Sequence, residues 1–391
     1  MKQQSGYVLP LMLISLFAAT MLWGVDVSGL GQRIRQAQVD ATRQALVEAR
    51  QALIAYAMTY DLDPDHTGNP RIGLMPCPDD DNDGSSELNC GSSDELAIGR
   101  LPFRTIAVPQ LRDGDGDCLW YVVAGRRKNN PDSNQPLNWD TPGQFDLVGH
   151  AGNALTGGSG PRAVAVVIAP HGPLAGIQRA NDDHACRGGS DATAEVAGFV
   201  ESLAANPVST PVTVTEGQFA DAANNDAVVW ITSDEVFRPL LRSAHFTGFL
   251  AQRESVAVVA IQNALAAGEL PAPDSAATSA DGDRQLGGLP DAATLLIGGT
   301  DARNHDDWRE MYRYLRCVDA SQCITVNGIG CRAMLAFGGT RNGGQMRPSA
   351  ALRDYFEEPL LSAMQTVSDT YSASAIWDPT TPGVDAVTCV N

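Results

Sequence analysis

The sequence is poor in positive charge and lacks the short motifs of common enzyme classes. It has 27 Lys and Arg residues against 46 Asp and Glu residues, so its formal net charge is -19 at pH 7. A field of this sign repels phosphate backbones, so no nucleic acid partner is expected, whereas cations are natural small partners. The patterns HExxH, GxSxG and Walker A are all missing, so no catalytic residue is predicted.

A catalytic triad can nevertheless assemble from residues that lie far apart in sequence. An anchored periplasmic hydrolase therefore stays as an alternative function. The six histidines include no pair at metal-ligand spacing. His171 lies in the turn "APHGPLAG", where we expect a surface side chain and not a general base.

The eight cysteines contain no CxxC pair, which argues against zinc ribbons and thioredoxin-like sites. An even set of scattered cysteines favours disulfides formed outside the cytosol. We expect the short-range pairs Cys77–Cys90 and Cys317–Cys323, and spacing leaves the other pairings open. The cysteines predicted to form disulfides are Cys77, Cys90, Cys118, Cys186, Cys317, Cys323, Cys331 and Cys389.

The N-terminal region has what the rest of the chain lacks, a long uncharged run. The segment "SGYVLPLMLISLFAATMLWGV" carries no charge from Ser5 to Val25. As a helix it would measure roughly 30 Å, the thickness of a bilayer's hydrocarbon core. The sequence therefore predicts a transmembrane segment at 7–25, with the short N-terminal end in the cytoplasm. A cleaved secretory signal is the alternative.

An amphipathic helix is predicted to continue from this segment, over 26–60. Small and apolar residues recur at steps of three and four from Ile34 to Tyr56, while arginines and acids occupy the other face. No Pro or Gly interrupts the chain between Arg33 and Tyr60. We expect one half of this helix to pack against neighbours and the other half on its own globular head.

The first residues, "KQQSGYVLPLMLISL", resemble the start of type IV pilins and type II secretion pseudopilins. The resemblance implies that residues 1–6 form a leader peptide, cut between Gly6 and Tyr7, and that the new amino group is methylated. It also implies packing of the helix among other pilin or pseudopilin subunits. Most pilins carry a glutamate at the position where this chain has Leu11. Minor pseudopilins at the filament tip lack this glutamate, as this chain does. The departure favours a minor, tip-type subunit.

Two segments of the head resemble a group of large bacterial pilin-like proteins. These are "GLMPCPDDDNDG" and "GRLPFRTIAVPQLRDGDGDCLWYVVAG", and a later "CITVNG" also matches. The implied fold is α+β, with a long transmembrane and amphipathic N-terminal helix and antiparallel sheets in a large head. The implied location is the bacterial inner membrane, single-pass with a periplasmic head, and then a filament at the cell surface.

The head repeats an order of elements, which predicts two tandem pilin-like α+β modules at 61–247 and 248–391. "PRAVAVVIAPHGPLAGIQRAN" aligns with "GCRAMLAFGGTRNGGQMRPSA", and a long helix precedes each. We expect a second long helix over Phe249–Ala267 and a short one from Ser233, with Ser as its N-cap. The predicted strands are Leu119–Ala124, Ala163–Ala169, Ala227–Ile231 and Ala333–Phe337.

Two acidic loops carry alternating aspartates. "DDDNDG" begins like a calcium loop, D-x-D-x-D-G, but its twelfth position is Cys90 where a bidentate Glu is usual. The predicted calcium ligands are Asp79, Asp81, Asp83, Ser85 and Glu87, and in the second loop Asp113, Asp115 and Asp117. The alternative for both is a solvated turn, with Arg112 pairing a neighbouring Asp in the second. A third acidic run, Asn304–Trp308, is expected to start a helix.

These observations predict a minor pilin-like subunit of a type IV pilus or type II secretion-like filament, acting in assembly, in display of its head, or in both. A calcium-stabilised adhesin, or a head that binds a surface or a secreted protein, is the alternative from a second class.

Overall fold

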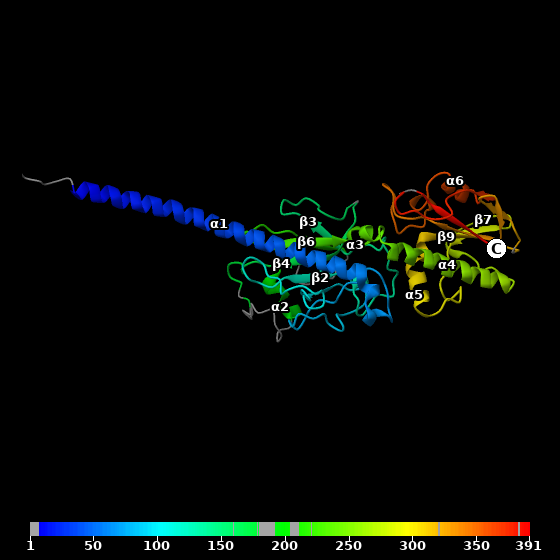
Figure 1. Ribbon diagram of the computed structural model, residues 1–391, viewed down its shortest axis with the longest axis horizontal. Coiled ribbons are helices and arrows are strands. Elements are labelled where there is room, and N and C mark those ends of the chain that lie inside the picture. Colours follow the sequence, from blue (N-terminus) through cyan, green and yellow to red (C-terminus); the bar gives the residue numbers. More distant parts are fainter. Residues whose placement is uncertain are drawn as a thin grey trace, which may run out of the picture.

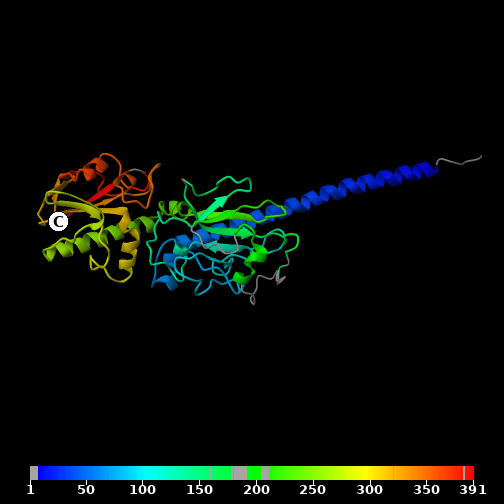
Figure 2. The same cartoon turned by 180° about the vertical axis from the view of Figure 1, so that it is seen from behind.

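The computed structural model describes residues 8–158, 160–177, 179, 192–203, 211–219, 221–319, 321–381 and 384–391, with side chains except at 8–11, 18–28, 192–195 and 275–278. Gly6 and Tyr7 lie outside the described residues. The fold is α+β with two large, mainly antiparallel sheets. A long helix, α1, runs from one end of the molecule into the first sheet, and the second sheet lies at the opposite end (Figures 1 and 2).

The first module is built on a six-stranded sheet in the order β1-β2-β4-β3-β5, with β6 also paired to β4. All its pairs are antiparallel except β3 with β5. Its elements are α1 (Val8–Thr59), β1 (Ala97–Arg100), β2 (Trp120–Val123), β3 (Phe145–Val148), β4 (Ala163–Ala169), α2 (Ala192–Phe199), β5 (Val212–Thr215), β6 (Ala227–Thr232) and α3 (Ser233–Leu240), with 3-10 turns at Tyr60–Leu62, Pro64–His66 and Gly125–Arg127.

The strand β4 is the centre of this module because every one of its residues is buried. Its sequence, AVAVVIA, consists of small and β-branched side chains, which pack well on a pleated surface covered on both faces. Leu46 and Leu53 of α1 belong to the cluster on one face of the sheet, while Phe199 of α2 packs with Trp120 on the other. The two helices thus bury the sheet between them.

The second module contains a five-stranded antiparallel sheet in the order β14-β12-β9-β8-β7 and a small sheet β11-β10-β13, in which β10 and β13 are parallel. Its elements are α4 (Ala244–Ala266), β7 (Asp274–Asp281), β8 (Arg284–Gly288), α5 (Gly299–Trp308), β9 (Tyr312–Cys317), β10 (Ile324–Val326), β11 (Ile329–Cys331), β12 (Ala333–Phe337), α6 (Leu360–Gln365), β13 (Thr370–Tyr371) and β14 (Ala386–Val390), with 3-10 turns at Arg309–Met311 and Leu352–Asp354.

The two modules share an order of pairing. In the first, β2 pairs antiparallel with the central strand β4, and in the second β9 pairs antiparallel with β12. The aligned sequence segments therefore occupy corresponding strands. The boundary that the sequence predicts, between 247 and 248, falls inside α4.

The modules are joined by a buried contact. Trp139 of the first packs edge-on against Trp308 of the second, with ring centroids 4.9 Å apart. Beside them the buried Arg71 guanidinium donates two hydrogen bonds of 2.8 Å to the two carboxylate oxygens of Asp307. Because a buried bidentate pair is costly to separate, this contact fixes how the modules sit on each other.

The prediction of a transmembrane anchor at 7–25 is wrong. Among the residues that the structure describes, no helix combines the length and the apolar character that crossing a bilayer requires. The prediction of a single-pass inner-membrane protein with a periplasmic head is withdrawn with it.

Two smaller predictions also need correction. Asn304–Trp308 does not start a helix but ends one, because α5 begins at Gly299. The N-cap of α3 is Thr232 and not Ser233; the backbone N–H of Thr232 donates to Glu235 at 2.8 Å. The strands predicted at Ala163–Ala169 and Ala333–Phe337 have the observed bounds of β4 and β12.

Candidate functional site

The first acidic loop leaves the sheet next to β1 and returns to a disulfide. Asp79 and Arg100 exchange backbone hydrogen bonds of 3.0 and 2.8 Å, which ties the start of the loop to the end of β1. The Cys77–Cys90 disulfide closes the loop behind it. Gly84 adopts a φ of +91°, and a Cβ there would meet the Phe103 ring at 2.4 Å. Only glycine therefore allows the sharp turn that the sequence pattern predicts.

Carboxylates hold this loop together from within. Asp79 accepts the backbone N–H groups of Asp83 at 3.1 Å and of Gly84 at 2.7 Å. Glu87 reaches back and accepts the N–H groups of Asp80 at 3.0 Å and Asp81 at 3.3 Å. Each acid thus accepts donors from the turn that it faces, which gathers negative charge on one side of the loop.

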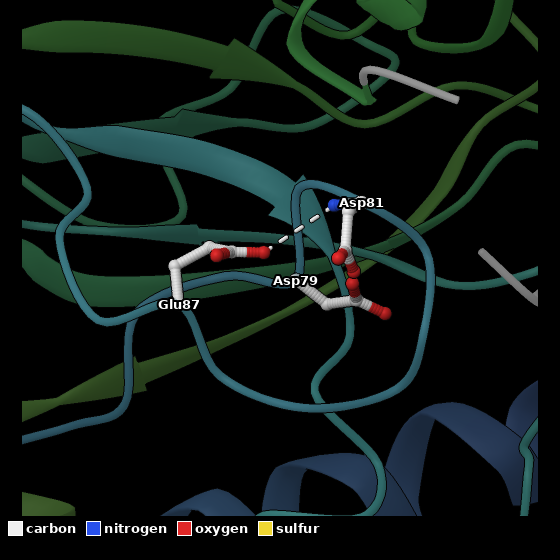
Figure 3. A group of neighbouring side chains, drawn as sticks. All are labelled: Asp79, Asp81 and Glu87. Carbon is white, nitrogen blue, oxygen red and sulfur yellow. Dashed lines mark hydrogen bonds between the residues drawn. The ribbon is translucent and has the colours of Figure 1, made fainter. Parts of the chain in front are cut away.

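Three of these carboxylates converge (Figure 3). One oxygen each from Asp79, Asp81 and Glu87 lies within 4.8 Å of the others. Asp83 is not part of this group, and its carboxylate accepts the backbone N–H of Ser85 at 2.6 Å. The structure thus brings together three of the five residues predicted for this loop. An all-oxygen set of this kind suits a hard cation such as calcium.

The electrostatics of the cluster are unfavourable without a cation. Asp79 is only 1% exposed, and this burial raises its pKa to about 6, although hydrogen bonds from Gly84, Asp83 and Asn82 oppose the rise. The charge of Asp83 adds to it. A bound cation would remove the cost of ionising Asp79, because an opposite charge favours the carboxylate form.

The second acidic loop uses its carboxylates differently. Asp113 accepts the N–H groups of Asp115 and Asp117, both at 2.9 Å, and of His171 at 2.8 Å. Asp117 pairs with Arg179. Arg112 donates to the carbonyl of Gly116 at 2.7 Å, and not to an aspartate. Among the described residues this loop does not form a three-ligand group of the kind found at Asp79, so we do not carry it forward as a cation site.

His171 is part of this arrangement, and the expectation that it lies at the surface is wrong. It is 3% exposed, with its Nδ1 at 2.9 Å from an Asp115 oxygen and its ring edge-on to Phe219. Asp115 and Phe219 stand 56 and 48 positions away in the chain, so spacing in the sequence gave no signal of the contact. The histidine serves to anchor the loop.

The tip of the second loop is also the point where α1 meets the head. The N–H of Gly114 donates to the Thr42 hydroxyl at 2.8 Å, and Gln38 donates to Asp115 at 2.9 Å. A Cβ on Gly114 would lie 2.1 Å from the Gln38 carbonyl oxygen. The helix and the loop approach so closely that only glycine fits, and sequence analysis did not find this contact.

Contacts divide α1 into two halves. The packed half (38–59) buries Thr42, Leu46, Ala49 and Leu53 on the head, while Arg50 pairs with Glu235 of α3. In the projecting half (8–37) the apolar side chains of Met12, Leu13, Ile14 and Leu16 are 62–68% exposed, and Leu30 and Ile34 are also exposed. The projecting half extends away from both modules (Figure 1).

The disulfides agree with the sequence where they were predicted. Cys77–Cys90 and Cys317–Cys323 are confirmed, and Cys331–Cys389 joins β11 to β14. Cys118 is also disulfide-bonded, while Cys186 lies outside the described residues. Bonds of this kind form in an oxidising compartment.

No protein-family model, curated protein or solved structure matches this chain.

Proposed function

We propose that this chain is a subunit of a pilus-like or secretion-type filament, held to its neighbours by the projecting half of α1. The observation that carries the proposal is the row of exposed apolar side chains at Met12, Leu13, Ile14 and Leu16. Apolar surface left in water costs about 25 cal/mol per Å², and association removes that cost. The large head is then the part displayed. The tip position expected from Leu11 stays a prediction, because that side chain is outside those described.

Self-association of the full chain tests this proposal. Sedimentation velocity and negative-stain microscopy would compare the wild type with the double variant Leu13→Asp, Leu16→Asp. We expect wild-type oligomers that lengthen with concentration, and a variant that stays monomeric. The double variant Gln51→Asp, Ala55→Asp adds the same charge on the solvent side of the packed half and should assemble. A wild type that is monomeric at every concentration contradicts the proposal.

We also propose that the first acidic loop binds a calcium ion that stabilises the head. The convergence of Asp79, Asp81 and Glu87 supports this second role. A ligand that binds the folded state alone raises the unfolding free energy by about 2.7 kcal/mol at a hundredfold excess over Kd. Melting with calcium and then with chelator should show this shift in the wild type, and none in Asp81→Asn. Equal shifts of the melting temperature in the wild type and in Asp81→Asn would show that the first acidic loop is not the calcium site.

The pH dependence gives an independent readout of the same site. Without calcium, the folded-state pKa of Asp79 is about 6, against an ordinary value of 3.8. The folded protein then binds the proton more tightly, so the unfolding free energy falls as pH rises between these values, by at most about 3 kcal/mol. Calcium should reverse the slope, since it needs the carboxylate. Subtracting the profile of Asp79→Asn isolates this group from others, such as Asp140, whose pKa is also raised to about 6.

A further inference from the structure

A groove of about 470 Å³ runs along α4 in the second module. One wall is the face of α4 with Val259, Ala260 and Ala264, and the other is the turn with Leu295 and Leu296. Leu296 is 92% exposed and Val259 is 50% exposed. Exposed apolar side chains and small alanines on these walls leave room for a further element, which no described part of this chain supplies.

The groove is long enough for about three turns of a helix, and it lies on a module with more acidic than basic residues. It follows α4 from Ser255 to Ala267, a length of about 18 Å at 1.5 Å per residue. The alanines on the α4 wall let the axis of a second helix approach closely, since the side chains at a contact set the distance between the two helix axes. Asp301 is the charged residue in its lining, and Arg253 of α4 pairs with it at 2.6 Å. The second module as a whole, from Ala244 onward, holds ten basic against seventeen acidic residues.

The projecting half of α1 has the complementary character. Its apolar residues include Leu30 and Ile34, and Arg33 and Arg35 flank Ile34 at exposed positions. The projecting half carries Arg33 and Arg35 against Asp26 alone. An apolar helix edged with arginines suits an apolar groove on an acidic module, because opposite charges favour the encounter and fix its register.

The projecting half of α1 and the helix α4 lie at opposite ends of the molecule, as both views show (Figures 1 and 2). They therefore meet only between copies, in a contact whose two sides differ, and such contacts build open series or rings. We propose that the groove between α4 and Leu296 of one copy receives the part of the projecting half of α1 around Leu30 and Ile34 of a second copy. This inference rests on the proposed function, because it names the surface to which α1 attaches. A regular series of this kind would replace a solitary tip position.

Complementation between two full-length variants tests this contact. The helix variant Leu30→Asp, Ile34→Asp keeps the groove, and the groove variant Val259→Arg, Leu296→Arg keeps the helix. Each alone should stay monomeric by sedimentation velocity, at concentrations at least tenfold above those at which the wild type assembles. Mixed in equal amounts they should form one heterodimer and stop, because neither remaining surface can extend the series.

A matched control variant allows each outcome of this test to be assigned to one cause. The double variant Gln252→Arg, Gln262→Arg adds the same charge to exposed α4 positions outside the groove lining, and should assemble normally. Unchanged far-UV circular dichroism and melting would show that all variants fold. Normal assembly of the groove variant overturns the inference and leaves the proposed function intact. Normal assembly of the helix variant also overturns the inference, whereas normal assembly of Leu13→Asp, Leu16→Asp overturns the proposed function itself. Two monomeric variants that fail to combine show a contact between like surfaces, which also overturns the inference.

Discussion

The two halves of α1 are one continuous helix with two different environments. From Gln38 onward the head supplies partners along one face: Asp115 for Gln38, Gly114 for Thr42 and the sheet for Leu53. Before Gln38 the described apolar side chains, from Met12 to Leu16 and at Leu30 and Ile34, are of the same kind, yet they are exposed to solvent. Isolated helices are marginally stable in water and gain most of their stability from packing. The projecting half therefore has the sequence of a packed helix without a packing surface of its own.

The two halves of α1 therefore have different roles, although both carry apolar residues of the same kind. The packed half contributes to folding, so changes there should lower the unfolding free energy. The projecting half contributes little to folding and should affect assembly alone. The following predictions run from the largest expected change in the unfolding free energy to the smallest.

Leu53→Ala should destabilise the head most. The side chain is fully buried in the cluster between α1 and the sheet, and large-to-small changes at such sites cost about 3 kcal/mol because a cavity remains. Urea denaturation of the full chain would measure the loss. A change below about 1 kcal/mol would mean that this half of α1 is not packed as described.

Gly114→Ala should cost about 2 kcal/mol, because the new methyl group would be forced into the backbone of Gln38. Gly116→Ala provides a comparison in the same loop, since a Cβ there meets nothing within 4 Å although its φ is +93°. Strain at that φ costs Gly116→Ala about 1 kcal/mol. Equal melting temperatures for the two variants would contradict the close approach of the loop to α1.

Arg50→Ala should lower stability by about 1 kcal/mol. Arg50 donates to the Trp230 carbonyl at 2.8 Å and pairs with Glu235, and both side chains are partly exposed, so water screens the pair. The effect should shrink as salt is raised. A loss that does not depend on salt would point to lost packing of the arginine stem and not to the ion pair.

Ile34→Asp should change the unfolding free energy by less than about 0.5 kcal/mol, as exposed substitutions usually do. Assembly should nevertheless weaken at least tenfold, because the new carboxylate enters an apolar contact. Stability and sedimentation measured on the same preparation would show the separation. A strong loss of stability would mean that Ile34 already packs on its own head, and the contrast between the halves would fail.

The sequence predicts regular elements well where one physical signal dominates. The strands β4 and β12 are continuous apolar runs in the sequence. The part of α1 from Arg33 onward has apolar residues at steps of three and four, with no Pro or Gly to interrupt it. The acidic run at His305, Asp306 and Asp307 misled, because acids stabilise helix N-termini in general. Here Asp306 accepts the N–H of Ala292 and Asp307 holds Arg71, so distant partners explain the acids at a helix end.

The two acidic loops show the same limit at the candidate site. Both alternate aspartates with a nearby glycine, and the pattern alone predicts one chemistry for both. His171, Arg179 and Gln38 lie against the second loop and occupy its carboxylates. The first loop has Cys90 and Glu87 to close it, and its carboxylates face one another. Only the tertiary fold distinguishes the two loops, because the spacing of residues within a loop does not show which residues from distant parts of the chain contact it.

Hydrogen–deuterium exchange along α1, in dilute and in assembled protein, tests the central claim most directly. We predict that backbone amides between Met12 and Ile34 exchange quickly in the monomer and become strongly protected on assembly, while those between Leu46 and Ala57 are protected in both states. Exchange in the projecting half that stays the same whether or not the protein has assembled would contradict the claim that this half joins the subunits.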